Sequence, residues 1–308
     1  MQSRRKFISQ AAVTALGMSM MSHSLKAAFL SGKKLPGVGL QLYTLFPAFD
    51  DDVTGNLKKI ADIGYKEIES AFTRKGGIYG MKPKEFAQQV KDAGMHWRSH
   101  HVLGAQFRMP KGMKPPVDAD GKPRGFPPMK NLTENYQELV DAAAEGGVQY
   151  LVCANIPIET ADEIRKAADV FNKTAEACKK AGLEFAYHNH VSEFDTIEGI
   201  QPFDYILSNT DKNMVKMELD LGWAAKAKQD PVELFKKHPG RFPLWHLKDF
   251  SADFKTITEI GAGTVDFKTS FDHAKSSGMK YFFLEQDGAP DPYVNIRNSY
   301  NNVKKILG

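Results

Sequence analysis

Eight short apolar runs of this chain each end in a polar side chain that can bind a metal ion or move a proton. Three of these side chains, Asp220, His246 and Glu285, provide two carboxylates and an imidazole. Because the set is rich in oxygen and offers no thiolate, it suits Mn²⁺, Mg²⁺ or Co²⁺, and it also accepts Zn²⁺. The full set of end residues is Gln41, Glu69, His101, Asn155, His188 with His190, Asp220, His246 with Lys248, and Glu285. The sequence therefore predicts a site for one divalent metal ion.

A metal site of this kind indicates proton transfer next to a carbonyl group. A divalent cation can stabilise the enediolate that forms when the neighbouring carbon loses its proton. Isomerisation, epimerisation and β-elimination all begin with this step, and they differ in where the proton or a leaving group goes. The candidates for the catalytic base and acid are His188, His190 and Lys248, because the field of a metal ion would lower their pKa values.

Six side chains at or near the run ends are predicted to contact the substrate. The rings of Tyr43 and Trp223 can stack on the apolar face of a sugar, although packing in the core explains these rings equally well. The six residues are Gln41, Tyr43, Glu69, His101, Asn155 and Trp223.

The elements that must position these residues are strands that alternate with helices. Strands are expected at 38–43, 65–69, 95–101, 149–155, 183–190, 215–220, 243–249 and 281–287, and helices at 50–63, 83–93, 131–146, 159–180, 200–209, 231–238, 266–277 and 291–306. Short connections predict a parallel sheet, and eight units predict one closed α/β structure, a (β/α)8 TIM barrel. The carboxyl ends of its strands meet at one rim, so the run-end residues should converge there.

One connection of the predicted barrel is long. Residues 107–130 join the third strand to the third helix and are rich in proline, lysine and arginine. Loops of this length in compact domains are usually functional or disordered. We expect a lid over the site, with a surface excursion as the alternative.

The first 27 residues have the pattern of an export signal. Arg4 and Arg5 form a twin-arginine pair, and a short apolar stretch without acidic residues follows. This stretch is too short for a stable membrane span. We therefore expect a signal at 1–27 that is removed, a linker at 28–36, and a barrel at 37–308 in the periplasm. A basic amphipathic N-terminus in a cytosolic protein is the alternative.

Charge and cysteine content narrow the class of protein further. The net charge of +4 comes from basic residues within 1–27, so the remaining chain is neutral and has no global field to attract nucleic acid. The chain has two cysteines, Cys153 and Cys178, which are predicted as buried free thiols in a strand and a helix. The sequence is compatible with an oligomer and leaves the oligomeric state open.

Several motifs in this order resemble the sugar phosphate isomerase/epimerase family, whose members have the xylose isomerase-like barrel. The resemblance runs from about residue 36 to the C-terminus. It is carried by Gly39 to Thr44, Tyr187 to His190 with Glu193 and Phe194, Asp220 to Trp223, His246 to Asp249, Gly261 to Phe267, and Glu285 to Asp287.

The resemblance implies one divalent metal held by Glu, Asp, His and Glu from strands five to eight. Asp220, His246 and Glu285 match three of these positions directly. His188 occupies the position of the first glutamate. Glu193 is the candidate for the missing carboxylate ligand, and His190 is its rival.

The resulting prediction is a metal-dependent sugar isomerase or epimerase that acts on a non-phosphorylated sugar or keto-sugar through an enediolate. Export argues against a phosphorylated substrate, because sugar phosphates are cytoplasmic. One alternative is a lyase that acts on 3-keto-glycosides at the same site. Alternatives of other classes are a non-catalytic sugar-binding barrel and a DNA-repair phosphodiesterase, and the neutral barrel disfavours the latter.

Two segments near the predicted site are expected to be structural. Lys216 and Glu218 share a strand face with Asp220, and we expect them to pair with each other in the lower layer of the barrel. The segment 261–264 (Gly-Ala-Gly-Thr) lacks the lysine of a phosphate-binding loop, and we expect it to form a turn.

Overall fold

The computed structural model describes residues 35–73, 75–106, 108 and 129–308. The predicted export signal, most of the predicted linker and nearly all of the predicted lid at 107–130 lie outside these residues.

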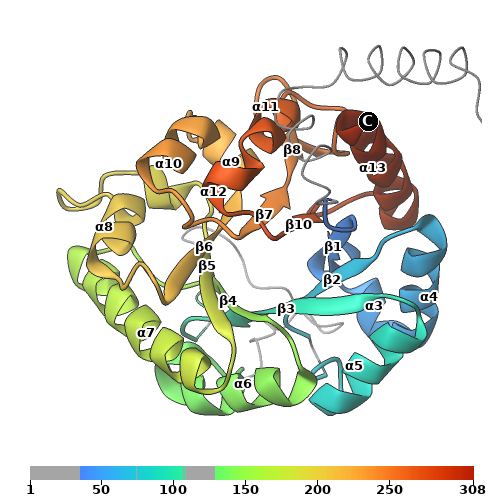
Figure 1. Ribbon diagram of the computed structural model, residues 1–308, viewed down its shortest axis with the longest axis horizontal. Helices are drawn as coiled ribbons and strands as arrows, with labels where there is room; N and C mark the ends of the chain where they lie inside the picture. The colour runs from blue at the N-terminus through green and yellow to red at the C-terminus, as the bar shows by residue number, and fades with distance from the viewer. Residues whose placement is uncertain (1–34, 74, 107, 109–128) are drawn as a thin grey trace, which may run out of the picture.

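Eight parallel strands close into a barrel at the centre of the molecule (Figure 1). Their order around the barrel is β1, β10, β7, β6, β5, β4, β3, β2, so β2 closes on β1. The strands are β1 (Gly39–Gln41), β2 (Glu67–Ser70), β3 (His96–Leu103), β4 (Tyr150–Asn155), β5 (Glu184–His188), β6 (Val215–Asp220), β7 (Leu244–Leu247) and β10 (Tyr281–Leu284). The predicted (β/α)8 barrel is confirmed.

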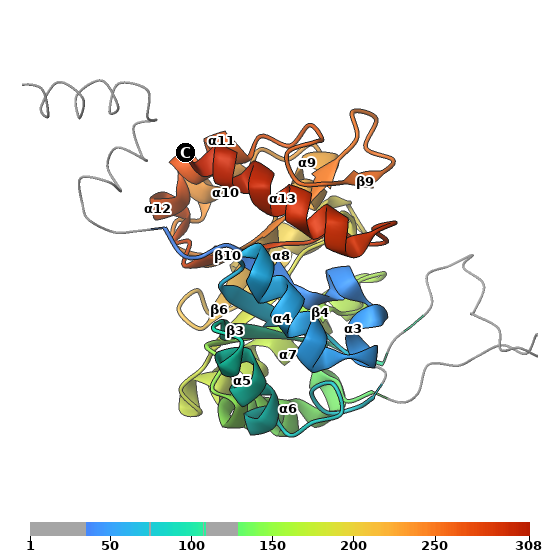
Figure 2. The same cartoon turned by 90° about the vertical axis from the view of Figure 1, so that its right-hand side faces the viewer.

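Helices form a layer around the barrel, and Figure 2 shows α4, α5 and α13 on the outside of this layer. The helices at or near the predicted positions are α4 (Val53–Ile63), α5 (Pro83–Asp92), α6 (Leu132–Gly146), α7 (Ala161–Lys180), α8 (Pro202–Asn209), α10 (Pro231–Lys237), α11 (Phe267–Asp272), α12 (Ala274–Ser277) and α13 (Pro292–Leu307). Elements that the apolar pattern did not predict are η1 (Leu42–Leu45), α3 (Ala48–Asp51), η2 (Ser192–Phe194), α9 (Leu221–Lys226), and the hairpin β8 (Asp249–Phe250) with β9 (Ile257–Thr258). Most of these additions follow the carboxyl ends of strands.

Local signals explain where the helices begin and end. The Thr160 side chain accepts a hydrogen bond from Glu163 N and so caps α7, and Asn131 does the same for α6. Gly278 follows α12 with φ of 87°, a left-handed conformation that costs glycine little. These caps fix the ends of the helices and thereby the points at which the strands begin.

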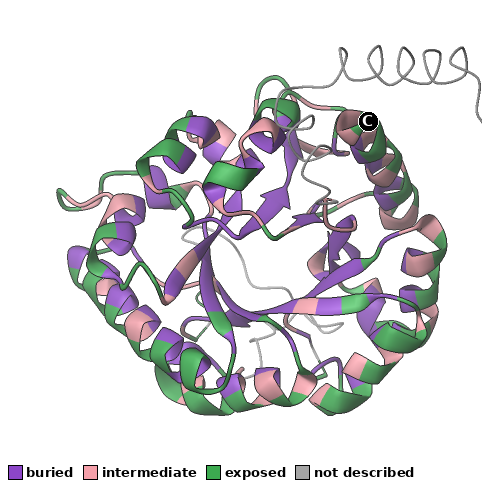
Figure 3. Ribbon diagram, viewed as in Figure 1, coloured by how far each residue is buried: buried purple, intermediate pink, exposed green. Residues whose placement is uncertain are grey.

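The core of the protein has two parts. Figure 3 shows buried strands at the centre, surrounded by helices that have both buried and exposed residues. One part fills the space between the strands and the helices; there Trp245 stacks on Phe235 with ring centroids 5.0 Å apart. The other part lies inside the barrel and is made of Tyr150, Val152, Ala186, Leu244 and Phe283. Burial of such side chains contributes roughly 1.5–3 kcal/mol each. This inner cluster fills the barrel interior with apolar side chains, so the barrel is packed and is not a pore.

The two cysteines, Cys153 and Cys178, are buried free thiols, as predicted. Within the described ranges, no helix has the length and apolar character needed to cross a membrane.

Candidate metal centre

Four side chains from the carboxyl ends of neighbouring strands meet at the rim of the barrel. They are His188 from β5, Asp220 from β6, His246 from β7 and Glu285, which follows β10. Each is buried, and one ligand atom from each lies within 4.8 Å of the others. We call these four residues the ligand group.

The parallel register of the strands produces this arrangement. Asp220 and His246 are directly paired residues of β6 and β7, and His246 pairs in turn with Phe283 of β10. Because Glu285 is two residues beyond Phe283, its side chain has the same orientation and lies one layer higher. The ligand group therefore depends on residues 188–285 being held in one continuous set of strands.

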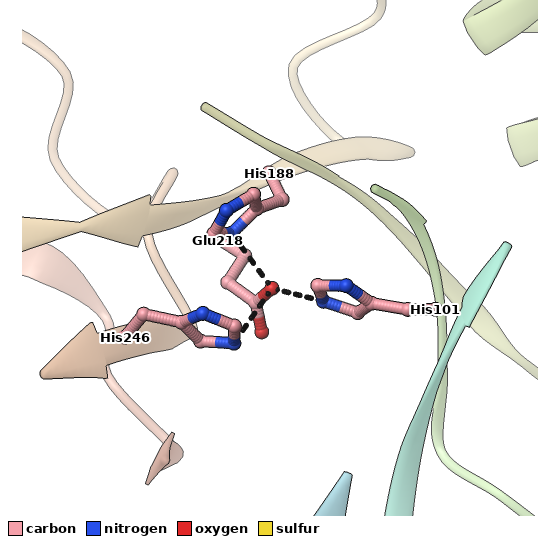
Figure 4. A group of neighbouring side chains, drawn as sticks. All are labelled: His101, His188, Glu218 and His246. Carbon is pink, nitrogen blue, oxygen red and sulfur yellow. Dashed lines mark hydrogen bonds and ion pairs between the residues drawn. The ribbon is translucent and has the colours of Figure 1, made fainter. Parts of the chain in front are cut away.

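A second group of side chains lies beside the first and shares two residues with it. The carboxylate oxygen Glu218 Oε2 is 2.6 Å from His101 Nε2, 3.2 Å from His188 Nδ1 and 3.2 Å from His246 Nε2. Figure 4 shows the three rings pointing at this carboxylate from β3, β5 and β7. We call His101, His188, Glu218 and His246 the histidine group.

This arrangement corrects the expected pairing of Lys216 with Glu218. Lys216 Nζ donates to the carbonyl oxygen of Lys212, and Glu218 lies fully buried among the imidazoles. Glu218 shares its strand face with Asp220, so it points into the barrel beneath that residue. This shared face was the signal that could have identified Glu218.

The ligand group fits a divalent cation. Asp220 Oδ1 accepts a hydrogen bond from Trp223 N, while Asp220 Oδ2 is buried and has no hydrogen-bond partner among the described residues. His188 Nδ1 is also buried without a hydrogen bond there. Unsatisfied buried polar atoms are costly, and a cation would satisfy the carboxylate oxygen. Two imidazoles and two carboxylates form a donor set that suits Mn²⁺, Co²⁺ or Zn²⁺.

The structure does not bring Glu193 into the ligand group. Glu193 Oε1 accepts a hydrogen bond from the Tyr187 hydroxyl at 2.6 Å, and Oε2 accepts one from His190 N at 2.9 Å. Asn189 Oδ1 accepts a hydrogen bond from Asp220 N, which joins the same segment to β6. Glu193 and Asn189 therefore hold the turn after β5 against its neighbours, and His188 is the member of this turn in the ligand group.

Lys248 is buried among carboxylates at the edge of the ligand group. Its Nζ lies 2.7 Å from Asp287 Oδ2, 2.9 Å from Glu285 Oε2 and 3.7 Å from Asp220 Oδ2. Burial opposes the charged form, but the charges of Glu285, Asp287 and Asp220 outweigh it and raise the pKa of Lys248 above its ordinary value. The ammonium group is therefore charged at neutral pH and donates hydrogen bonds to these carboxylates. Asp287 was not among the predicted site residues.

The pKa values of the ligand-group residues Asp220, Glu285 and His188 are shifted in different directions, because each residue has different charged neighbours. Burial raises the pKa of Asp220 to about 7, against the opposing charges of Lys248 and His246. Burial opposes the ionised form of Glu285 too, but Lys248 and His246 lower the pKa of Glu285 below its usual value. For His188, burial and the nearby charges of His246, His190 and His101 lower the pKa well below 6.5. His188 is therefore neutral, the form in which imidazole binds a metal.

His190 is the accessible imidazole of the site. Its side chain is 40% exposed, and its ring centroid is 4.9 Å from that of His188 and 6.0 Å from that of Trp223. Burial of the rest of the ring lowers the pKa of His190, while the Glu193 carboxylate opposes this shift. Trp223 also lies beneath Lys248, whose Nζ is 5.1 Å from the ring centroid. His190, Trp223 and Lys248 thus lie together beside the ligand group.

The remaining predicted substrate contacts fall at two depths. The Tyr43 ring packs against Phe46 and Phe72, with centroids 5.5 and 5.3 Å away. Burial and the charges of Asp287 and Glu285 raise the pKa of Tyr43, so this ring lies near the same carboxylates as Lys248. Gln41 and Glu69 lie deeper, as do the rings of the histidine group, and Gln41 Nε2 donates to Glu69 Oε1 at 2.7 Å.

Asn155 ends β4, where its carbonyl oxygen accepts a hydrogen bond from Gly104 N. No hydrogen bond between described residues joins the Asn155 side chain to the ligand group.

The predicted turn at 261–264 is confirmed. The backbone N–H groups of Gly261, Gly263 and Val265 donate to the buried carboxylate of Asp249, at 2.9 to 3.0 Å. A Cβ atom at Gly263 would lie 2.3 Å from Asp249 Oδ1, so the segment can fold around this carboxylate only with glycine at that position. Because its amide groups donate hydrogen bonds within the protein, they are not free to bind a phosphate, and the segment has a structural role.

Comparisons with known proteins agree with the fold. A family model described as xylose isomerase-like TIM barrel matches residues 57–302. An inosose dehydratase of Geobacillus kaustophilus is 29% identical over 164 residues, which are 47% of this chain and 52% of that protein. The match to this relative thus spans about half of its length.

Solved structures give the same architecture. A sugar phosphate isomerase/epimerase from Parabacteroides distasonis superposes with a TM-score of 0.71 at 27% identity, over 88% of this chain and 99% of that one. The IOLI protein with a bound zinc atom has a TM-score of 0.64 at 14% identity, over 88% of this chain and 98% of that one. The latter likeness shows the fold alone.

Proposed function

The chain belongs to the xylose isomerase-like TIM barrel family, and from this premise we propose that it is a divalent-metal-dependent enzyme of carbohydrate chemistry. It removes a proton next to the carbonyl group of a non-phosphorylated sugar or keto-sugar, as sugar isomerases and epimerases do. The observation that carries the proposal is the ligand group, four buried donors that converge at the carboxyl ends of four neighbouring strands. In TIM-barrel enzymes this rim is the place of catalysis.

His188, Asp220, His246 and Glu285 would hold the cation. When bound, it supplies Lewis-acid stabilisation of the negative charge that appears on the carbonyl oxygen of the substrate. The donor set and the zinc atom named for the IOLI structure support Zn²⁺ as well as Mn²⁺ or Co²⁺. His188 takes the ligand role that the sequence motif suggested for Glu193, since Glu193 is bound to Tyr187 and His190 N.

His190 and Lys248 have complementary roles in the proton transfer. His190 is neutral and partly exposed, so it can accept the carbon-bound proton. Lys248 is charged and contacts Glu285, a carboxylate of the ligand group. Its ammonium group is therefore close enough to the proposed cation to donate a hydrogen bond to an oxygen of the bound substrate. Trp223 lies beside both side chains and offers its ring to the apolar face of a sugar.

Elimination is the second candidate outcome of the same first step. The relatives matched by sequence are named inosose dehydratase, and a dehydratase removes water from its substrate. The charged Lys248 would then stabilise the leaving oxygen by a hydrogen bond. A lyase that acts on 3-keto-glycosides is the corresponding activity on a glycoside.

The test is proton exchange in D₂O. The metal-loaded protein is incubated with glucosides, their 3-keto forms and a panel of ketoses, and deuterium at carbon is followed by NMR. Deuterium next to the carbonyl without loss of a group indicates isomerisation or epimerisation, whereas release of an aglycone or water indicates elimination. Absence of exchange in every substrate would reject the proposed function.

A matched variant separates an enzyme from a sugar-binding barrel. Glu285→Gln should abolish exchange and weaken metal binding, because a ligand carboxylate is lost. A protein that only binds sugar would keep most of its sugar affinity in this variant and would show no exchange in either form.

Export to the periplasm remains a proposal supported by Arg4, Arg5 and the apolar segment after them. Replacement of both arginines by lysine should retain the protein in the cytoplasm, as measured by cell fractionation. N-terminal sequencing of the exported protein tests cleavage after Ala27. An exported double-lysine variant would contradict the twin-arginine route.

A further inference from the structure

The two ring nitrogens of His246 face different sets of carboxylates. Nδ1 lies 2.9 Å from Glu285 Oε2, within the ligand group. Nε2 lies 2.5 Å from Glu69 Oε1 and 3.2 Å from Glu218 Oε2. An ionised carboxylate only accepts hydrogen bonds, so a nitrogen placed between two of them acts as the donor. The single proton of a neutral His246 ring therefore belongs on Nε2.

We propose that Glu69 and Glu218 are positioning residues that keep this proton on Nε2 and thereby present the Nδ1 lone pair to the cation. A ligating histidine usually donates its other N–H to an oxygen acceptor, which fixes the tautomer and the ring orientation and makes the ligand more basic. The inference rests on the proposed function only in that the ligand group binds a cation.

Both carboxylates are held in place by hydrogen bonds from several neighbours. Glu69 accepts hydrogen bonds from Gln41 Nε2 at 2.7 Å and from Ser99 Oγ at 2.5 Å, and Glu218 is 2.6 Å from His101 Nε2. Both side chains are completely buried among these partners. Glu69 therefore acts through its contact with His246.

The hydrogen-bonded groups form a closed ring of alternating acids and imidazoles. His101 Nε2 contacts both Glu218 Oε2 and Glu69 Oε1, the latter at 3.1 Å, and His246 Nε2 contacts the same two oxygens. The His101 and His246 rings are parallel, with an angle of 6° and centroids 5.3 Å apart. Glu69 from β2 and Glu218 from the neighbouring strand β6 thus position an imidazole of β7.

Binding of the cation at the histidine group would reverse the role of His246 Nε2. If a cation were held by the histidine group, Glu218 and the Nε2 atom of His246 would be ligands, and Nε2 could not carry a proton. The identity of the protonated nitrogen in the loaded protein therefore decides between the two arrangements.

The first test is long-range ¹H–¹⁵N NMR of the protein loaded with Zn²⁺, with His246 assigned by loss of its signals in His246→Gln. We expect a proton on Nε2, slow to exchange, and none on Nδ1. A proton on Nδ1, or an Nε2 bound to zinc, would overturn the inference. This measurement needs no variant of the supporting carboxylates, so a folding defect in them cannot obscure it.

The second test measures Co²⁺ affinity by calorimetry in Glu69→Gln and Glu218→Gln. Loss of such a partner should weaken binding by about 10–100-fold. The matched control is Glu67→Gln, since Glu67 lies on the same strand but pairs with Arg98 at 2.6 Å. If the two variants bind Co²⁺ as the control does, the positioning role is excluded. Neither test uses turnover, so a protein that passes both and exchanges no proton would lose the proposed function and keep this inference.

Discussion

The ammonium group of Lys248 lies 2.9 Å from Glu285 Oε2 in the mouth of the barrel, where the lysine side chain is 2% exposed. Lys248 and the proposed cation therefore interact with the same carboxylate. In the absence of a cation, the positive charge of Lys248 lies within hydrogen-bond distance of both Glu285 and Asp287. The stability of the metal-free protein should depend on it.

Replacement of Lys248 by methionine tests this dependence. Lys248→Met leaves buried carboxylates without their partner, and breaking a buried pair in this way costs about 3–5 kcal/mol. We expect a loss of this size in the free energy of unfolding in urea without metal, and a recovery of much of it when Zn²⁺ is added. Lys226→Met, at a lysine over the same Trp223 ring, is the control. Equal stability of the two variants without metal would contradict this account.

The ligand role of Asp220 can be separated from its structural role. Asp220 caps α9 through Oδ1, and an asparagine side chain at this position would keep the cap because asparagine is an equally good capping residue. Asp220→Asn should therefore fold normally but bind cations more weakly. The loss should exceed about 100-fold, because removal of a residue that only hydrogen-bonds to a ligand already weakens binding by up to about 100-fold. Calorimetric titration measures the affinity. Asp230→Asn, which alters the cap of α10, should bind as the wild type does.

The close contact of Gly222 with the backbone of Lys248 should matter for metal binding. A Cβ atom at Gly222 would lie 2.2 Å from the carbonyl oxygen of Lys248, so Gly222→Ala must displace the end of β7. We expect a loss of about 1–3 kcal/mol in stability and a weaker cation affinity. Gly182→Ala is the control, because that site has φ of 79° but open space around it. It should lose stability through backbone strain alone, with cation affinity unchanged.

Cation affinity should rise with pH. Burial raises the pKa of Asp220 to about 7, and the carboxylates around His246 raise its pKa well above 6.5 against the effect of burial. Both groups must lose a proton to bind a cation, so protons compete with the cation at low pH. The affinity should increase at least about tenfold per pH unit up to pH 7. The slope of the logarithm of the affinity against pH gives the number of protons released on binding. In Asp220→Asn this number should fall by one, and an unchanged number would exclude Asp220 as a ligand.

The proposed base can be tested apart from the ligands. His190→Gln should reduce turnover by about 10²–10⁴-fold, the usual contribution of a positioned base, while the cation affinity stays the same. Turnover on the substrate identified by D₂O exchange and a Co²⁺ titration measure the two effects. The control is His273→Gln at the junction of α11 and α12. A variant that loses turnover and cation affinity together would indicate that His190 is a ligand.

Much of the site could be predicted from sequence because a barrel strand places its last residues at the rim. Asp220, His246 and Glu285 were predicted to meet on this ground, and the structure brings them together with His188. The prediction of Glu193 as a donor rested on the family resemblance, which implies a glutamate ligand, and on its place five residues after His188. Glu193 instead lies in η2, where Tyr187 and His190 N use its oxygens.

The residues that sequence reasoning missed are those whose partners come from other strands of the barrel. Glu218 was expected to pair with Lys216, its neighbour on the same strand face, but its partners are His101, His188 and His246 from three other strands. Asp287 acquires its role only through Lys248, which follows a different strand. Such contacts depend on barrel closure and register, which no local pattern reports.

The sequence by itself determined the alternation of strands and helices, the (β/α)8 barrel and the polar residues at the strand ends, because periodicity and helix caps act over a few residues. Only the tertiary structure decided which side chains meet at the site. It places His188 and not Glu193 in the ligand group, keeps Lys248 charged among carboxylates, and directs Glu69 and Glu218 at the ring of His246. The physical reason is that ligand geometry and buried charge depend on atoms brought together by long-range register. The charge of each group is set by neighbours that lie up to 177 residues away along the chain, as for His246 and Glu69.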